Sequence, residues 1–406
     1  MKKTFYFFIL LLVFYFPINA INNYPFFTFC TDSIIDVISH PMGNEKSTFE
    51  DVRNAYAQLP ISWQEENDKA ACPRIYQLLL HELVLVLEEH AHEALVQILN
   101  CFIVDKNNNQ QPLQGWVLKE HLATNVMVKS YKQYVPSPLF RNDSNKKYIA
   151  LVSPYKDENG TFYSAGTRFV LAEESDDYYY VYSFDKTTKS FQEISLPSSI
   201  CSLEYENKTL HFSEKKELFC KLVSLWAHIK KGFIPLVWGG ASIGKVWDQA
   251  DYFESVHYDA QGNEYNTWDR PRYGNNTYMG IDSSMLVLRA AQLVGIPYYY
   301  RNSTTATAFL PHKDLSQEIE NGDLLWVPGG LLIVNNVEHN MIVTTMSYNA
   351  GYGCVIELPL SDVFKEISTY QDLRNAIRND KDLTLLDHKG NPFRTIRNIK
   401  IFTLPY

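Results

Sequence analysis

Short apolar runs separated by turn-forming residues occupy the middle of the chain, and they limit the folds that it can adopt. Residues 83–87 (Leu-Val-Leu-Val-Leu), 95–99 (Leu-Val-Gln-Ile-Leu) and 115–118 (Gly-Trp-Val-Leu) are each too short for an average helix. The polar stretch 107–112 breaks the series between the last two runs. Short apolar runs bounded by turns predict β-strands. We therefore expect a β-rich N-terminal half.

The same pattern of short strands and turns continues further along the chain, at residues 149–152, 166–173 and 178–184. The segment Pro136-Ser137-Pro138 interrupts the series in the manner of a linker. Two small β-barrels therefore fit the pattern better than one sandwich. We place them at residues 30–130 and 140–210.

The pattern changes to a helical one near residue 213. Leu218, Leu222, Leu225 and Ile229 recur at helical spacing within residues 213–231. Strand, helix and several strands are expected after this segment, which predicts an α+β domain at residues 215–370. A C-terminal extension follows at 371–406. The predicted fold class is α+β, with two β-barrels followed by this domain.

The first twenty residues have the features of a secretory signal peptide. Lys2 and Lys3 precede an apolar run at residues 5–16, and Ala20 supplies a small residue at the exit. The run is shorter than the ~20 residues that a membrane-spanning helix needs. A buried N-terminal helix is the alternative. We expect a protein exported to the periplasm or the cell wall and extracellular space, without a membrane span in the mature chain.

Charge and cysteine content narrow the classes of function. The chain has 46 acidic and 37 basic residues, a formal charge of −9. Nucleic acid is therefore not an expected partner, because phosphate backbones are bound by clustered Lys and Arg. The six cysteines lack the spacing of a zinc site, and a disulfide between some of them stays open. Neither a metal nor an organic cofactor is expected.

Four segments in a fixed order indicate the chemistry. They are residues 236–242 (Leu-Val-Trp-Gly-Gly-Ala-Ser), 280–284 (Gly-Ile-Asp-Ser-Ser), 322–326 (Gly-Asp-Leu-Leu-Trp) and 337–343 (Val-Glu-His-Asn-Met-Ile-Val). Together they resemble the NlpC-type cell-wall peptidases, papain-like enzymes that cut peptidoglycan stem peptides. The resemblance covers about residues 215–370. It implies a papain-like α+β domain.

The β-rich half adds to this resemblance. The segment 95–122, which ends in Gly-Trp-Val and a later Leu122, is similar to the end of a bacterial SH3-like domain. The second β-rich block is similar but weaker. Two SH3-like domains before a papain-like domain are typical of the subgroup that cleaves γ-D-glutamyl–diamino-acid bonds.

The nucleophile position of the family holds Ser283 instead of cysteine. A helix start lowers the pKa of a thiol and supplies a reactive thiolate. A serine hydroxyl is far too weak an acid for that, so His339 would have to deprotonate it during attack. Lost or impaired hydrolysis and a working Ser–His pair both stay open. Cys354 is a further, displaced candidate nucleophile.

The resemblance also assigns the catalytic partners. His339 is the expected base. The alternative is a structural histidine whose ring nitrogens have hydrogen-bond partners inside a β-sheet. Glu357 is the best candidate to orient its ring, although a surface carboxylate on a strand fits as well.

Substrate binding is expected next to the nucleophile. In the family, the Asp before the nucleophile and nearby hydroxyls hold the free amine of the stem peptide. Asp282 matches that position, Ser284 follows the nucleophile, and Ser303 or Thr304 supplies a further hydroxyl. Asp282 also fits a helix N-cap, and the two roles are compatible. Trp238 belongs to the Trp-Gly-Gly segment and is expected to face the peptide.

An insertion at residues 243–279 separates the first two motifs and is rich in Trp, Tyr, Asp and Asn. It is either a lid or binding loop beside the site or a surface decoration. The function predicted from these features is an exported peptidoglycan stem-peptide hydrolase, or a catalytically impaired homologue. A non-catalytic protein that binds wall peptides through Asp282 and the insertion is the alternative. An acyltransferase of the same broad fold is a third.

Overall fold

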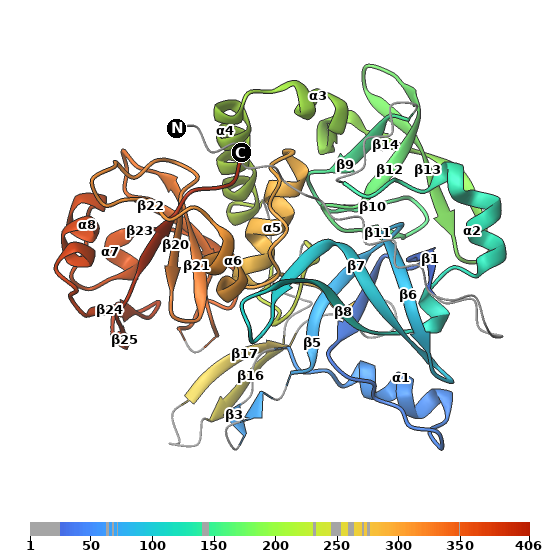
Figure 1. Cartoon of the computed structure of the whole chain (residues 1–406), viewed down its shortest axis with the longest axis horizontal. Coiled ribbons are helices and arrows are strands. Elements are labelled where there is room, and N and C mark those ends of the chain that lie inside the picture. The colour runs from blue at the N-terminus through green and yellow to red at the C-terminus, as the bar shows by residue number, and fades with distance from the viewer. Residues whose placement is uncertain are drawn as a thin grey trace.

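The computed structural model describes residues 25–61, 65–66, 69–70, 72–139, 146–229, 233–244, 253–258, 264–269, 272–273, 277–348 and 350–406. The predicted signal peptide at residues 1–20 lies outside these residues. Two antiparallel sheets form the N-terminal half, and a third sheet with its helices forms the C-terminal half (Figure 1). The predicted α+β class is confirmed. Within the described residues, no helix is both long enough and apolar enough to cross a membrane.

The first sheet contains the apolar runs that the sequence marked as strands. Its order is β1-β6-β7-β8-β2-β5, and the bounds are β1 Phe26–Phe29, β2 Ile34–Ile38, β5 Arg74–Leu79, β6 Leu83–Glu89, β7 Glu93–Val104 and β8 Gln110–Leu118. Helix α1 (Phe49–Ala57) buries Val52 and Tyr56 against Trp116 on β8. Two short strands, β3 (Glu65–Glu66) and β4 (Lys69–Ala70), pair with each other after α1 in the chain.

The second sheet has the order β14-β13-β12-β9-β15. Its bounds are β9 Tyr148–Leu151, β12 Arg168–Glu174, β13 Tyr178–Asp185, β14 Ser190–Pro197 and β15 Cys201–Leu203, and a hairpin of β10 (Tyr155–Lys156) and β11 (Phe162–Tyr163) lies beside it. Helices α2 (Asn125–Tyr131) and α3 (Glu204–Thr209) flank this sheet in sequence. Each of the two sheets keeps two edge strands, so the strand pairing of the described residues does not close a barrel. The limits 30–130 and 140–210 and the SH3-like character stay predictions.

Helices α4 and α5 connect the two halves. The helix expected within residues 213–231 is confirmed as α4 (Phe212–Ala227), and α5 spans Ser283–Leu293. In Figure 1 both helices stand between the C-terminal sheet on the left and the N-terminal sheets on the right. Phe219 of α4 and Leu286 of α5 share one apolar core with Val96 of the first sheet. The two halves are therefore packed together through a continuous core.

The third sheet carries the remaining motifs. Its order is β23-β22-β21-β20-β26, with bounds β20 Leu324–Val327, β21 Gly330–Asn336, β22 Met341–Thr345, β23 Val355–Pro359 and β26 Lys400–Phe402. The extension at 371–406 supplies most of α8 (Tyr370–Arg378), the hairpin of β24 (Leu383–Leu386) and β25 (Pro392–Ile396), and the edge strand β26. Helices α6 (Ser303–Phe309) and α7 (Leu360–Val363) complete this half. The C-terminal extension is therefore an integral part of the third sheet and its core.

The insertion forms short hairpins where the structure describes it. Strands β16 (Phe253–Tyr258) and β17 (Glu264–Asp269) pair, and so do β18 (Arg272–Tyr273) and β19 (Thr277–Tyr278). Residues 245–252, which include Trp247, Asp248 and Tyr252, lie outside the described residues. Figure 1 shows the β16–β17 hairpin projecting below the helices. Its predicted role as a lid or binding loop stays a prediction.

Candidate functional site

Ser283 occupies the first turn of α5, as the sequence predicted. Asp282 is the N-cap of this helix, and its Oδ1 accepts hydrogen bonds from the backbone N–H groups of Ser284 at 3.0 Å and Met285 at 2.9 Å. A cap of this kind satisfies two N–H groups that have no partner inside the helix. Ser283 is half-buried. The local sequence thus fixes both the start of the helix and the place of the serine.

The second oxygen of the Asp282 carboxylate is paired with an arginine. Arg301 Nη1 lies 3.3 Å from Asp282 Oδ2, and the arginine is buried. Arg301 also donates from Nε to the carbonyl of Ile75 on β5, and from Nη1 to Ser284 Oγ at 3.3 Å. Asp282 therefore acts as a helix cap and as the counter-ion of a buried cation. A peptide amine would have to compete with Arg301 for this carboxylate.

The residue that faces the Ser283 hydroxyl is a glycine. A Cβ placed on Gly330 would stand 3.5 Å from Ser283 Oγ, and the backbone N–H of Leu331 donates to that Oγ at 3.3 Å. Gly330 begins β21 directly after the turn Val327-Pro328-Gly329. Gly329 has φ of +99°, which suits glycine after proline in a type II turn. The serine therefore faces main chain at this strand, and no side chain extends toward it from position 330.

His339 lies in the turn between β21 and β22, and it is exposed. Gly330 and Asn336 are the first and last of the seven residues of β21, and His339 follows three residues later. With a rise of about 3.3 Å per residue, the two ends of this strand are about 20 Å apart. The backbone N–H of His339 donates to Asn336 Oδ1 at 3.0 Å within the turn. The structure does not bring His339 to Ser283, because the strand carries the histidine to the opposite end of the sheet.

Glu357 is also directed elsewhere. It lies on β23, and its side chain is 8% exposed. Its carboxylate accepts from Ser224 Oγ of α4 at 2.9 Å and from Asn335 Nδ2, and it lies 3.2 Å from His228 Nδ1. These partners belong to the face of the sheet that α4 covers. The structure shows no described contact between Glu357 and His339, so the predicted orienting role has no geometric support.

The predicted hydroxyl-bearing residues lie at the starts of two helices, Ser284 in α5 and Ser303 and Thr304 in α6. Ser284 is buried, with its Oγ 2.7 Å from Asp282 Oδ1 and 2.8 Å from the carbonyl of Arg301. Ser303 and Thr304 open helix α6, which Asn302 caps at the Thr305 N–H. Ser303 is half-buried and Thr304 is exposed. The Ser284 hydroxyl is thus occupied within the protein, while the other two stand at the surface.

Trp238 lies in the segment that runs beside the helix start. Its backbone N–H donates to the carbonyl of Ile61 at 2.8 Å, and its own carbonyl accepts from Arg74 Nη1 at 3.3 Å. The ring is 36% exposed. Two residues later, the carbonyl of Gly240 accepts from the Asp282 N–H at 3.1 Å. Trp238 is therefore an accessible aromatic side chain close to the helix cap.

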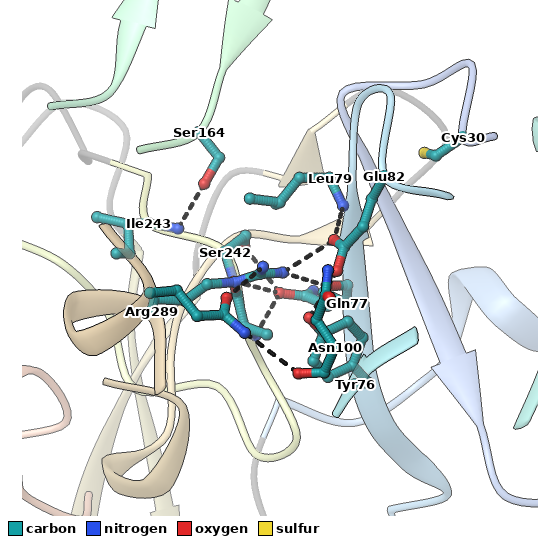
Figure 2. A network of polar contacts seen from close by, with 12 residues as sticks. Cys30, Tyr76, Gln77, Leu79, Glu82, Asn100, Ser164, Ser242, Ile243 and Arg289 are labelled. Atoms are coloured by element: carbon teal, nitrogen blue, oxygen red, sulfur yellow. Dashed lines mark hydrogen bonds and ion pairs between the residues drawn. The ribbon is translucent and has the colours of Figure 1, made fainter. Parts of the chain in front are cut away.

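Sequence reasoning missed the residue that holds this segment in place. Gln77 on β5 is fully buried, and its Oε1 accepts from Ala241 N at 3.1 Å and from Ser242 Oγ at 2.7 Å. Arg289 of α5 donates to the carbonyls of Ala241 at 2.8 Å and Gln77 at 3.0 Å, and it pairs with Glu82 at 3.1 Å. Figure 2 shows these side chains converging between the first sheet and α5. The available signal was a glutamine in the middle of a strand that is apolar or aromatic apart from Arg74 at its start.

Three of the cysteines are too strongly buried to act as nucleophiles, and the role of Cys354 stays a prediction. All six are free. Burial raises the pKa of Cys101, Cys201 and Cys220 to about 12, which keeps these thiols protonated. Cys354 is half-buried and bridges to Pro235 through the backbone. Among the described residues, no group of three or more His, Cys, Asp and Glu side chains could hold a metal ion.

Comparison with solved structures identifies the fold. An NlpC/P60 family protein from Bacillus cereus matches with a TM-score of 0.51 at 13% identity, covering 82% of this chain and 94% of that one. Two proteins of Trichomonas vaginalis match less well, with TM-scores below one half. NlpC2 has 0.30 at 10% identity (82% and 93% covered), and NlpC1 has 0.28 at 12% (84% and 90%).

The comparisons by sequence give a different result. No family description matches the chain, and no curated protein is significantly similar to it. The chain therefore has a cell-wall-peptidase-like fold of the NlpC/P60 type.

Proposed function

We propose that this protein is an exported, non-hydrolytic binder of peptidoglycan stem peptides, built on an NlpC/P60-type fold that has lost its hydrolytic chemistry. The observation that carries the proposal is the environment of Ser283. The position facing its hydroxyl on β21 is Gly330, and His339 lies at the other end of the strand. A serine without a base in reach is a poor nucleophile at neutral pH.

Loss of chemistry leaves the features that serve binding. The start of α5 places the positive end of a helix dipole next to Ser283, although Asp282 already accepts from two of its N–H groups. Trp238 offers an aromatic surface, and Ser303 and Thr304 offer hydroxyl groups at the start of α6, directly after Arg301 and Asn302 in the chain. The peptide is then held by the groups that would have positioned it for cleavage.

The remaining parts of the proposal concern the rest of the chain. Residues 1–20 direct export and are removed, and the mature protein acts in the periplasm or at the cell wall. The two N-terminal sheets correspond to SH3-like domains at residues 30–130 and 140–210, which precede the papain-like domain at 215–370. Expression with and without residues 1–20, followed by fractionation, tests the export. Retention of the complete chain in the cytoplasm contradicts it.

Binding and turnover are separated with one peptide. Calorimetry with L-Ala-γ-D-Glu-diaminopimelate measures the affinity, and mass spectrometry of the same mixture measures cleavage. We expect binding without cleavage, and we expect Ser283→Ala to leave the affinity within about twofold, because the hydroxyl makes only one weak hydrogen bond in the described structure. Cleavage that Ser283→Ala abolishes would instead identify a working serine hydrolase. Absence of binding refutes the proposed function.

A further inference from the structure

The C-terminal hairpin of β24 and β25 brings a cation to the rim of the candidate site. Arg394 on β25 has its Nη1 3.4 Å from the point where a Cβ on Gly329 would stand. The next residue, Gly330, faces Ser283 Oγ. Neighbouring Cα atoms are about 3.8 Å apart. The guanidinium therefore lies against the turn that borders Ser283.

Several contacts fix this hairpin against the third sheet. Leu383 and Leu386 are buried, and the N–H of Lys365 donates to the carbonyl of Thr384 at 2.9 Å. At the tip of the hairpin, the N–H of His388 donates to the carbonyl of Ala350 at 2.9 Å. Figure 1 shows the hairpin at the lower edge of the sheet that contains β20 and β21. The fold thus fixes the stretch of backbone from which Arg394 extends.

The charge of Arg394 is available to a ligand. Its side chain is exposed, and in the described part of the chain no ion pair joins it to an acidic side chain. Arg397, three residues later, differs in this respect, because it pairs with Asp382 at 3.1 Å between Nη2 and Oδ2. Arg394 is therefore an exposed cation beside the site of a chain whose formal charge is −9.

The chemistry of the proposed ligand supplies an anion for this cation. A γ-linked glutamyl residue keeps its α-carboxyl group free, and diaminopimelate carries a further carboxylate. A guanidinium binds a carboxylate through two parallel N–H donors, which a lysine cannot reproduce. We propose that Arg394 is a specificity-determining residue that pairs with a free carboxylate of the wall peptide bound beside Ser283. This inference rests on the proposed function and names the group of the ligand that is recognised.

The experiment compares three peptides and two neutral variants, with Arg394→Lys as a third variant that keeps the charge. The peptides are L-Ala-γ-D-Glu-diaminopimelate, its form with the glutamyl α-carboxyl amidated, and its form with lysine in place of diaminopimelate. Arg394→Gln removes the cation, and Arg397→Gln is the control because that arginine is already paired. Calorimetry gives each affinity, and thermal unfolding verifies that both variants keep their fold, as expected for exposed side chains.

We expect the wild type and the Arg397→Gln control to bind the first peptide about three- to tenfold more tightly than one of the other two peptides, each of which has one carboxylate fewer. Arg394→Gln should bind the first peptide and that more weakly bound peptide equally, and Arg394→Lys should restore only part of the preference. If Arg394→Gln keeps the preference, or if the wild type has none, the role of Arg394 is wrong while the proposed function stands. If the wild type binds no peptide, both fail.

Discussion

The two ends of strand β21 differ in what they offer to chemistry. At the first end, Gly330 faces Ser283 and contributes only main chain. At the second end, Asn336 leads into the turn that carries His339. The two ends are about 20 Å apart. The order of motifs along the sequence therefore predicts a histidine at about the position of His339. In the folded hairpin, however, this histidine lies at the end of β21 that is far from Ser283.

A buried ion pair and backbone hydrogen bonds hold the strand near its second end. Asp323 is fully buried, and its Oδ2 lies 2.6 Å from Nζ of Lys313, which is also buried. The backbone of Gly322 and Asp323 exchanges hydrogen bonds with Val334 on β21 at 2.7 and 2.9 Å. Burial raises the pKa of the Asp323 carboxyl, although Lys313 counteracts this. The charged pair of Asp323 and Lys313 at this end stabilises the fold, whereas Gly330 at the first end has no side chain.

The largest effect is expected from repairing the first end. The double variant Ser283→Cys/Gly330→His places a thiol at the helix start and an imidazole opposite it, where a Cβ on residue 330 has room. We expect cleavage of the wall peptide at a rate about 100-fold or more above that of Ser283→Cys alone. Mass spectrometry of timed samples measures this. Equal rates for the two variants would show that position 330 does not face the reacting group.

Breaking the second end should cost stability and leave the site unchanged. Lys313→Met removes the partner of a buried carboxylate, so we expect the free energy of unfolding to fall by about 3–5 kcal/mol. Urea unfolding measures the loss. Lys389→Met is the control, because Lys389 is exposed in the β24–β25 turn, and it should change little. A small effect of Lys313→Met would mean that this end does not depend on the ion pair.

A buried histidine elsewhere sharpens the contrast with His339. His81 is buried between the N-terminal sheets, and burial lowers its pKa from 6.5 to about 3. Since its pKa is lower in the folded state than in the unfolded state, its contribution to stability is present above pH 6.5. That contribution is lost as the pH falls toward 3, by up to about 1.4 kcal/mol per pH unit.

His81→Asn removes this titration and suits the backbone, because φ of residue 81 is +67°, where Asn is tolerated. We expect unfolding free energies measured between pH 3.5 and 7.5 to depend less on pH in this variant than in the wild type. The same dependence in both proteins would contradict the assignment to His81.

The smallest effect is expected at His339 itself. His339→Ala removes an exposed ring from a turn in which only its backbone N–H has a described hydrogen bond. Peptide affinity should stay the same, and the free energy of unfolding should change by less than about 0.5 kcal/mol. Calorimetry and urea unfolding test both. A loss of peptide binding would place His339 near the ligand and remove the difference between the two ends of β21.

Local sequence determined the elements of this fold. Short apolar runs with period-two burial became strands of the first sheet, and the spacing of Leu218 and Leu222 became α4. Asp282 fixed the start of α5, because a side-chain oxygen caps the N–H groups that follow it in the chain. These features depend on residues within a few positions of one another, so the sequence predicts them directly.

Only the tertiary structure decided which side chains meet. Gly330 faces Ser283 although the two residues are 47 positions apart in the sequence. Gln77 holds Ser242 from 165 positions away, and Arg301 reaches Ile75 from 226. Such contacts follow from sheet register and helix packing, and a reversal of one hairpin moves a side chain by the length of a strand. For that reason the place of Ser283 at the start of a helix was predictable, whereas the residue that faces it was not.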